Sequence, residues 1–221
     1  MADEPRPDGQ AARAGPLTGA GGPVPGVTPG RRFVDGVAYA AWLHDGQRRK
    51  ATAVPYLSHL LAVASLVLED GGSEDEAIAA LLHDALEDQG ERTSADEVER
   101  RFGPTVARIV LGCSETTGGP RPPWRQRKQA SLEHLATAEP DVVRVSLADK
   151  LHNARAVVTD YRRLGEGLWS RFNAGRDAQL WYYRSLATVF ARRSHSAMAD
   201  ELTRLVAELG DLVEAPEGPR G

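Results

Sequence analysis

Residues 79–88 have the sequence AALLHDALED, an apolar segment that carries one histidine and three carboxylates within six residues. A soluble protein rarely places so many ionisable groups among alanines and leucines unless another interaction offsets their desolvation. On a helix, His83 lies one turn before Glu87, and Asp84 lies one turn before Asp88, so the four side chains occupy adjoining faces. A bound cation would explain this cluster. The segment therefore predicts the centre of a metal-dependent active site.

The composition is that of an ordinary globular protein. The chain has 221 residues, which suits one domain with a tail or at most two small domains. Hydrophobic residues make up 41% and charged residues 26%, a balance that allows a sizeable core. A net charge of −4 and a pI near 5.9 argue against broad nucleic-acid binding, which usually needs a basic surface.

The sequence also bears on location. The N-terminus contains Asp3 and Glu4 and has no apolar core, so it does not resemble a signal peptide. No stretch approaches the roughly 18 apolar residues of a membrane span. The single cysteine, Cys113, allows neither an intrachain disulfide nor a thiolate metal cluster. We expect a cytoplasmic protein without nucleic-acid or membrane partners, and its oligomeric state stays open.

Three regions are expected along the chain. Residues 1–30 contain seven glycines and six prolines and almost no large apolar residue, so they predict a disordered tail. Residues 31–213 form the folded domain, and residues 214–221 a frayed C-terminal tail. The tail at the N-terminus is interpreted as passive, with a regulatory or targeting role as the alternative.

The folded region predicts an all-α bundle packed around a central helix that carries His83 and Asp84. Apolar periodicity and capping residues place helices from residue 31 to a stop at Gly46, and then at about 56–69, 74–88, 94–102, 104–113, 124–136, 141–163, 176–193 and 196–213. Ser73 with Glu76, and Ser94 with Glu97, predict capping boxes. No run of alternating apolar and polar residues indicates a strand.

Two other predicted helices bring ligand-type residues out of apolar surfaces. Asp149 lies in the segment SLADKLHNAR at 146–155, with Asn153 one turn further on the same face, and His59 lies in PYLSHL at 55–60. Taken alone, His59 could be a satisfied core histidine and Asp149 a partner in a buried salt bridge. A single cation would satisfy His59, His83, Asp84 and Asp149 together. Two imidazoles and two carboxylates suit Mn²⁺, Fe²⁺ or Zn²⁺ better than Ca²⁺ or Mg²⁺. We interpret His44 and His152 as structural.

Two basic clusters complete the pattern. Arg48, Arg49 and Lys50 follow the first helix, and Arg121, Arg125, Arg127 and Lys128 lie in a stretch, residues 116–132, that has no acidic residue. In an acidic chain such clusters attract a polyanion. A solvated face is the alternative. The interleaved Trp124 and the loop setting favour phosphate binding.

Four motifs in order resemble a known family. They are His44-x-Gly46-Gln47-x-Arg49-Lys50, Pro55-Tyr56-x-x-His59, Leu81-Leu82-His83-Asp84-x-x-Glu87-Asp88 and Ala148-Asp149-Lys150-Leu151-x-Asn153-x-Arg155. A histidine, a His-Asp pair and a distant aspartate are the pattern of the HD metal-dependent phosphohydrolases. More narrowly, the chain resembles the hydrolase domain of the Rel/Spo alarmone enzymes, over about residues 33–193. It is most similar to the stand-alone small alarmone hydrolases.

The resemblance implies an activity and residue roles. It implies Mn²⁺-dependent removal of the 3′-pyrophosphate from guanosine tetra- or pentaphosphate, giving GDP or GTP and pyrophosphate. The implied metal ligands are His59, His83, Asp84 and Asp149, and Glu87 and Asp88 match the pair that positions or activates water. The residues implied to contact the substrate are Arg49, Lys50, Trp124, Arg125, Arg127, Lys128, Asn153 and Arg155.

Other functions stay open within the same resemblance. One is a phosphohydrolase acting on another nucleotide, such as an NADPH 2′-phosphatase, an activity associated with animal members of the group. A second is a non-catalytic nucleotide-binding module, and a third is a scaffold with a structural metal. Two departures from the family pattern stand out. Residues 51–55 read ATAVP where a Ser-Gly-Glu-type turn is usual, and Ala154 replaces a usual leucine.

Overall fold

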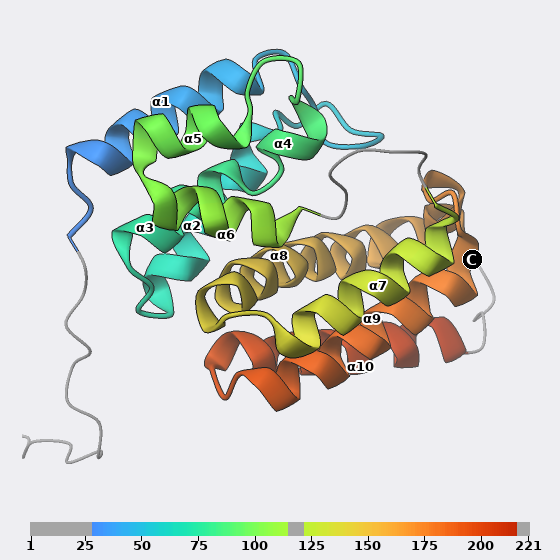
Figure 1. Cartoon of the computed structure of the whole chain (residues 1–221). Helices are drawn as coiled ribbons and strands as arrows, with labels where there is room; N and C mark the ends of the chain where they lie inside the picture. The colour runs from blue at the N-terminus through green and yellow to red at the C-terminus, as the bar shows by residue number, and fades with distance from the viewer. Residues whose placement is uncertain (1–27, 115–121, 216–221) are drawn as a thin grey trace, which may run out of the picture.

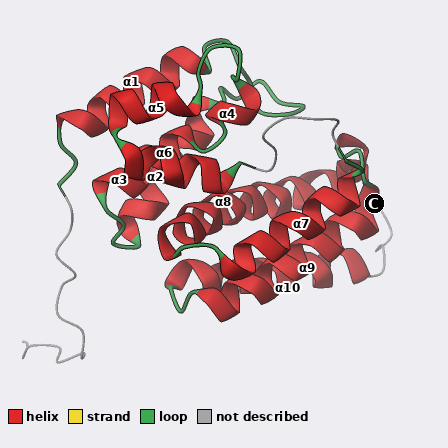
Figure 2. Ribbon diagram, viewed as in Figure 1, coloured by secondary structure: helices red, strands yellow, loops and turns green. Residues whose placement is uncertain are grey.

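The computed structural model describes residues 28–114 and 122–215, and every regular element in these ranges is a helix (Figures 1 and 2). This confirms the predicted all-α class. In chain order they are α1 (Arg31–Leu43), α2 (Leu57–Glu69), α3 (Glu74–Leu82), α4 (Ala85–Asp88), α5 (Ala95–Phe102), α6 (Pro104–Cys113), α7 (Trp124–Thr137), α8 (Pro140–Leu164), the 3-10 helix η1 (Gly165–Arg171), α9 (Gly175–Arg193) and α10 (Ala197–Glu214). The sequence did not predict η1. The tails expected at 1–30 and 214–221 lie almost wholly outside the described residues, and Glu214 is the last residue of α10.

Two helices organise the packing. The short helix α3 is buried from Glu76 to Leu82 and contacts α1, α2, α6 and α8. The 25-residue helix α8 contacts α2, α3 and α6 on one side and α9 and α10 on the other, and Figure 1 shows it running between these two groups. The His-Asp segment at the end of α3 therefore lies in the centre of the group formed by α1, α2, α3 and α6. Helix α8 connects this group to α9 and α10.

The predicted capping box at the start of α3 is confirmed. Ser73 Oγ accepts a hydrogen bond from the amide of Glu76 (3.2 Å), and Glu76 Oε2 accepts one from the amide of Ser73 (2.7 Å). The Glu76 carboxylate also pairs with Arg144 of α8, which ties the cap to the long helix. At α5 only half of the device forms. Ser94 Oγ accepts from the amide of Glu97, but the Glu97 carboxylate pairs with Arg100 and Arg101 instead.

The helix predicted at 74–88 is not continuous. It ends at Leu82, turns at His83 and Asp84, and resumes as the single turn α4. His83 Nδ1 donates to the carbonyl oxygen of Ala80 (2.8 Å), which is the acceptor that the amide of Asp84 would use in an uninterrupted helix. The side chain of His83 thus replaces a backbone donor at the break.

The loop between α1 and α2 contains an unfavourable backbone conformation. Ala51 has φ +57°, and it is the third residue of a turn closed by the amide of Thr52 and the carbonyl of Arg49 (3.1 Å). A left-handed conformation costs an alanine about 1–2 kcal/mol, and glycine adopts it without this cost. The unusual ATAVP sequence therefore keeps the turn but strains it.

We predict that Ala51→Gly raises the free energy of unfolding by about 0.5–1 kcal/mol, because relief of the strain exceeds the added entropy of the unfolded chain. Urea denaturation of both proteins would measure the change. Ala53→Gly is the matched control, since Ala53 lies in the same loop without a positive φ. It should destabilise the protein, and equal effects of the two substitutions would contradict the explanation.

Candidate metal centre and active site

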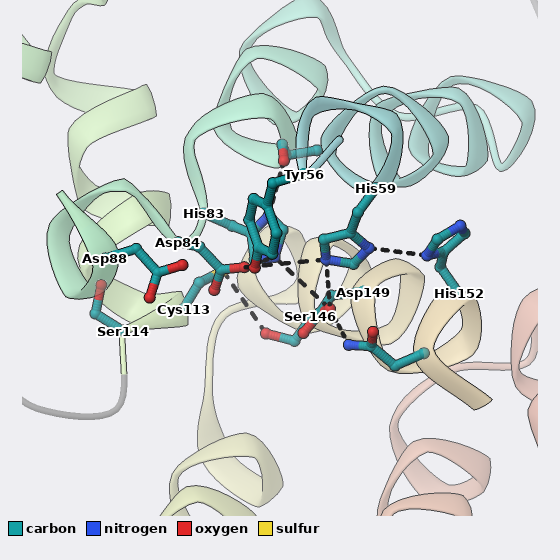
Figure 3. A network of polar contacts seen from close by, with 12 residues as sticks. Tyr56, His59, His83, Asp84, Asp88, Cys113, Ser114, Ser146, Asp149 and His152 are labelled. Atoms are coloured by element: carbon teal, nitrogen blue, oxygen red, sulfur yellow. Dashed lines mark hydrogen bonds and ion pairs between the residues drawn. The ribbon is translucent and has the colours of Figure 1, made fainter. Parts of the chain in front are cut away.

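His59, His83 and Asp149 meet at one buried point, although they come from α2, the end of α3 and α8 (Figure 3). One potential ligand atom from each lies within 4.8 Å of the others. Asp149 Oδ1 is 3.2 Å from His59 Nε2 and 3.6 Å from His83 Nε2. Three helices distant in sequence therefore bring two imidazole nitrogens and one carboxylate oxygen together, as a single cation requires.

Asp84 joins this group from one side. Its Oδ2 lies 2.9 Å from His83 Nε2 and 3.9 Å from His59 Nε2, and the hydroxyl of Tyr56 donates a hydrogen bond to the same oxygen. Burial and the carboxylate of Asp84 raise the pKa of Tyr56, so its hydroxyl keeps its proton and can donate. All four predicted ligands are thus neighbours, and Tyr56 orients one of them.

The charges at this point favour a cation. Burial opposes protonation of His83, but the carboxylates of Asp84 and Asp149 outweigh it and hold the histidine pKa well above its usual range. His83 Nε2 is buried and faces these two carboxylates at 2.9 and 3.6 Å. Burial favours the neutral form of Asp149, yet Lys150 and the imidazoles keep its pKa well below its usual range. The carboxylates therefore attract positive charge, which a divalent metal would supply.

The donor atoms fit such a metal. Because the Ala80 carbonyl can only accept, His83 Nδ1 carries a proton and Nε2 faces the carboxylates. Proteins usually orient a metal-binding histidine by a hydrogen bond from its other ring nitrogen to an acceptor such as a backbone carbonyl. A mixed set of imidazole nitrogens and carboxylate oxygens suits a divalent transition metal.

A pocket of about 560 Å³ opens onto this group. Its walls include residues of both charges: Tyr56, His83, Asp84, Glu87, Trp124, Arg127, Lys128, Asp149, Lys150 and Asn153. A second pocket of about 330 Å³ shares Trp124, Lys128, Lys150 and Asn153 with the first and adds Arg49 and Lys50. The two pockets therefore form adjoining compartments, one with the candidate metal ligands and one beside it.

Glu87 and Asp88 occupy different positions. Glu87 lines the larger pocket. Asp88 is exposed, and its Oδ2 accepts a hydrogen bond from Gln47 Nε2 (2.8 Å). Gln47 Oε1 in turn accepts from Nδ1 of the buried His44 (2.7 Å). Of the two carboxylates, Glu87 is the one whose side chain faces the pocket.

Arg49 and Asn153 reach the candidate ligands through hydrogen bonds. Arg49 Nη2 donates to Asn153 Oδ1 (2.9 Å), and Asn153 Nδ2 donates to Asp149 Oδ1 (2.6 Å). The motif after α1 and the motif in α8 are therefore in direct contact. Lys50 is exposed and lines the smaller pocket.

The segment at the start of α7 is divided between the pocket and the outer surface. Trp124 and Lys128 line both pockets, and Arg127 lines the larger one. Arg125 lines neither of them; its guanidinium lies 3.3 Å from the centre of the Trp181 ring, as a cation–π contact. Arg121 lies outside the described residues.

Arg155 also lines neither pocket. Its Nε and Nη2 donate to Glu201 of α10 at 2.6 and 2.8 Å, in a bidentate ion pair. The prediction that Arg155 contacts substrate is therefore not supported by its contacts, which indicate a structural role between α8 and α10.

We predict that Arg155→Met leaves KM unchanged and lowers the free energy of unfolding by at most about 1 kcal/mol, because water screens this partly exposed pair. Steady-state kinetics and urea denaturation would test both parts. Arg155→Met combined with Glu201→Gln should cost little more than either change alone. A severalfold rise in KM with normal stability would instead support contact with the substrate.

Lys150 and His152 lie beside the candidate ligands, although the sequence predicted no site role for Lys150 and a structural role for His152. Lys150 Nζ donates to Asp149 Oδ2 (2.6 Å), and Lys150 lines both pockets. Its position beside Asp149 in an apolar helix was a signal that could have been used. His152, interpreted as structural, lies 2.8 Å from His59, Nδ1 to Nδ1, and burial with nearby His59 and Arg49 lowers its pKa to about 4. Its neighbours could not be read from the sequence.

The fold and the site together define a helical domain with a His/Asp centre that suggests a divalent metal. Comparison with known proteins identifies the family: the HD domain matches residues 36–179. The chain belongs to the HD domain family. In the part of the chain that the structure describes, no helix is long and apolar enough to cross a membrane.

Similar proteins fall in one group. The zebrafish guanosine-3′,5′-bis(diphosphate) 3′-pyrophosphohydrolase MESH1 is 33% identical over 181 residues, which cover 80% of this chain and 94% of the relative. The human MESH1 is 37% identical over 127 residues, 56% of this chain and 68% of the relative. The bifunctional (p)ppGpp synthase/hydrolase SpoT of Escherichia coli K12 is 32% identical over 120 residues, 52% of this chain but 16% of that longer protein.

Solved structures agree with this assignment. A metazoan orthologue of SpoT, described as hydrolysing ppGpp, superposes with a TM-score of 0.67 at 26% identity, covering 83% of this chain and 98% of the other. The protein lmo0812 from Listeria monocytogenes superposes with a TM-score of 0.60 at 30% identity, covering 68% and 97%. The chain is thus an HD phosphohydrolase homologous to ppGpp hydrolases, as its motifs predicted.

Proposed function

We propose that the chain is a Mn²⁺-dependent guanosine-3′,5′-bis(diphosphate) 3′-pyrophosphohydrolase, which converts guanosine tetra- or pentaphosphate into GDP or GTP and pyrophosphate. The observation that carries the proposal is that two members of the His59, His83 and Asp149 cluster, His83 and Asp149, line a pocket that is also lined by a carboxylate, Glu87, and by cationic side chains. The relatives named above act on the same nucleotide.

The two adjoining pockets suit the two parts of this substrate. Arg127, Lys128 and Lys150 line the larger pocket, where they would neutralise the charge of the 3′-pyrophosphate. Arg49, Lys50 and the ring of Trp124 border the smaller pocket, where they would contact the nucleoside and its 5′-phosphates. Asn153, in the wall between them, would hydrogen-bond the ribose or its phosphate.

Hydrolysis needs a group that removes a proton from water. The water oxygen forms a bond to the phosphorus attached to the ribose 3′-oxygen, the bond between that phosphorus and the 3′-oxygen breaks, and the 3′-oxygen takes up a proton. Glu87, which lines the larger pocket, would accept the proton of water, and such general base catalysis contributes about 10²–10⁴-fold. Asp88 accepts a hydrogen bond from Gln47 and would help to position the attacking water.

His59, His83, Asp84 and Asp149 would hold the divalent metal. The metal would lower the pKa of a bound water and polarise a phosphoryl oxygen. Mn²⁺ is our choice because two imidazoles with two carboxylates suit it better than Ca²⁺ or Mg²⁺, and Fe²⁺ and Zn²⁺ are the alternatives for the same ligand set.

The test is product analysis with purified protein and Mn²⁺. Guanosine tetraphosphate and NADPH are supplied in parallel, and pyrophosphate and orthophosphate are measured separately. We expect pyrophosphate and GDP from guanosine tetraphosphate, and no product from a His83→Ala variant. His195→Ala, which changes an exposed histidine outside both pockets, is the control for loss of an imidazole.

Other outcomes discriminate among the remaining functions. Orthophosphate from NADPH alone would replace the proposal with a phosphatase acting on that nucleotide. Metal binding with no product from either substrate would contradict the proposed reaction and favour a nucleotide-binding module.

A further inference from the structure

Arg49 is connected to two candidate metal ligands at once. Its Nη1 lies 3.1 Å from His152 Nδ1, and its Nη2 donates to Asn153 Oδ1 at 2.9 Å. His152 Nδ1 is also 2.8 Å from His59 Nδ1, a contact drawn as a dashed line in Figure 3, and Asn153 Nδ2 donates to Asp149 Oδ1. The Arg49 guanidinium is thus the start of two chains of hydrogen bonds, which we call arms. The first arm passes through His152 to His59 on α2, and the second passes through Asn153 to Asp149 on α8.

The direction of the first arm follows from the chemistry of arginine. A guanidinium has only hydrogen-bond donors, so His152 Nδ1 must be an acceptor in its contact with Arg49. The same nitrogen then cannot donate to His59. His59 Nδ1 must therefore carry the proton of that hydrogen bond, so Arg49 and His59 share the single lone pair of His152 Nδ1. The lone pair of a neutral His59 is then on Nε2. This is the atom that faces the carboxylates of Asp149 and Asp84.

The direction of the second arm is also determined. Arg49 can only donate, so the atom of Asn153 that it contacts is the amide oxygen, and the NH₂ group is left to face Asp149. Asp149 Oδ1 accepts that hydrogen bond while it faces both imidazoles. Arg49 therefore sets the orientation of the amide that holds the carboxylate.

We propose that Arg49 and His152 are positioning residues of the metal centre, in which His152 fixes His59 as an Nε2 ligand and Arg49 orients both His152 and Asn153. This goes beyond the contact with the nucleotide given to Arg49 above, and it rests on the metal site of the proposed function. Substitution of residues that orient metal ligands in this way typically lowers metal affinity or activity by about 10–100-fold.

The proposal and a purely substrate-binding role make different predictions. If Arg49 only contacts the nucleotide, its removal raises KM and leaves the affinity for the metal unchanged. If Arg49 orients the ligands, its removal weakens metal binding in the absence of any nucleotide. A structural role of His152 alone would lower stability without a selective effect on the metal.

The experiment measures Mn²⁺ binding to the full chain without substrate, by calorimetry and by the electron paramagnetic resonance of free Mn²⁺. His152→Phe keeps a ring but removes the acceptor, and we expect its affinity to fall about 10–100-fold. His152→Asn places an acceptor oxygen near the original Nδ1 and should stay close to wild type. His195→Phe is the matched control at an exposed position and should bind normally. Arg49→Met should also weaken binding, and circular dichroism would show that each variant is folded.

A second measurement reads the proton directly. Nitrogen-15 chemical shifts of His59 in the Zn²⁺-loaded protein should show a proton on Nδ1 and the metal on Nε2. Metal on Nδ1, or equal Mn²⁺ affinity of wild type, His152→Phe and Arg49→Met, would overturn the inference while leaving the proposed function standing. Wild-type protein that binds no Mn²⁺, Fe²⁺ or Zn²⁺ would instead overturn the metal site, and with it the proposed function.

Discussion

Replacing Asp149 by alanine is expected to abolish metal binding and hydrolysis and also to destabilise the protein. Asp149 is buried and faces both imidazoles, so its loss removes the carboxylate shared by the candidate ligands. The same substitution leaves the ammonium of Lys150 without its partner at 2.6 Å. Leaving a buried charge unpaired costs about 3–5 kcal/mol, and the lower end applies because the Lys150 side chain keeps 23% of its surface exposed.

A second substitution separates the two effects. The double variant Asp149→Ala with Lys150→Met removes the unpaired charge, so its free energy of unfolding should recover most of the lost stability. It should still bind no Mn²⁺ and release no pyrophosphate. Urea denaturation and Mn²⁺ titration of the single and double variants measure the two quantities. Normal metal affinity in Asp149→Ala would show that Asp149 is not a ligand.

Local signals explain why most helix positions could be predicted. Ser73 and Glu76 satisfy each other within one turn, and Pro104 begins a helix because its missing amide proton is not needed there. The apolar positions of α8 follow the helical period, which placed Asp149 and Asn153 on one face. These features depend on residues three or four apart, so the sequence alone contains them.

The remaining features depend on partners that are distant in sequence. At the break after Leu82 the imidazole of His83 donates to the carbonyl of Ala80, and a helical pattern does not reveal that hydrogen bond. Arg125 and Arg155 lie two residues from the pocket residues Arg127 and Asn153 in the sequence, but neither of them lines a pocket. Arg125 contacts Trp181 instead, and Arg155 pairs with Glu201. Likewise, the role proposed for His152 depends on its contact with Arg49, which lies 103 residues earlier. Contacts of this kind cannot be predicted from a motif, because they depend on residues outside it.

Glu87→Gln is expected to lower kcat by about 10²–10⁴-fold with little change in KM or in Mn²⁺ affinity. Glu87 lines the pocket beside the candidate ligands but does not belong to the group of ligand atoms that converge. Glutamine keeps the size of the side chain and its capacity for hydrogen bonds but cannot accept the proton of water at neutral pH. The loss should therefore fall on the chemical step alone.

The matched control is Glu91→Gln, the same substitution four residues later at an exposed position that lines neither pocket, and its kinetics should match wild type. Steady-state rates of pyrophosphate release and Mn²⁺ titration of the three proteins test the expectation. If Glu87→Gln raised KM while kcat stayed normal, Glu87 would be a binding group, and Asp88 would become the candidate base. Asp88→Asn would then show the loss of kcat, although its hydrogen bond to Gln47 points to an orienting role.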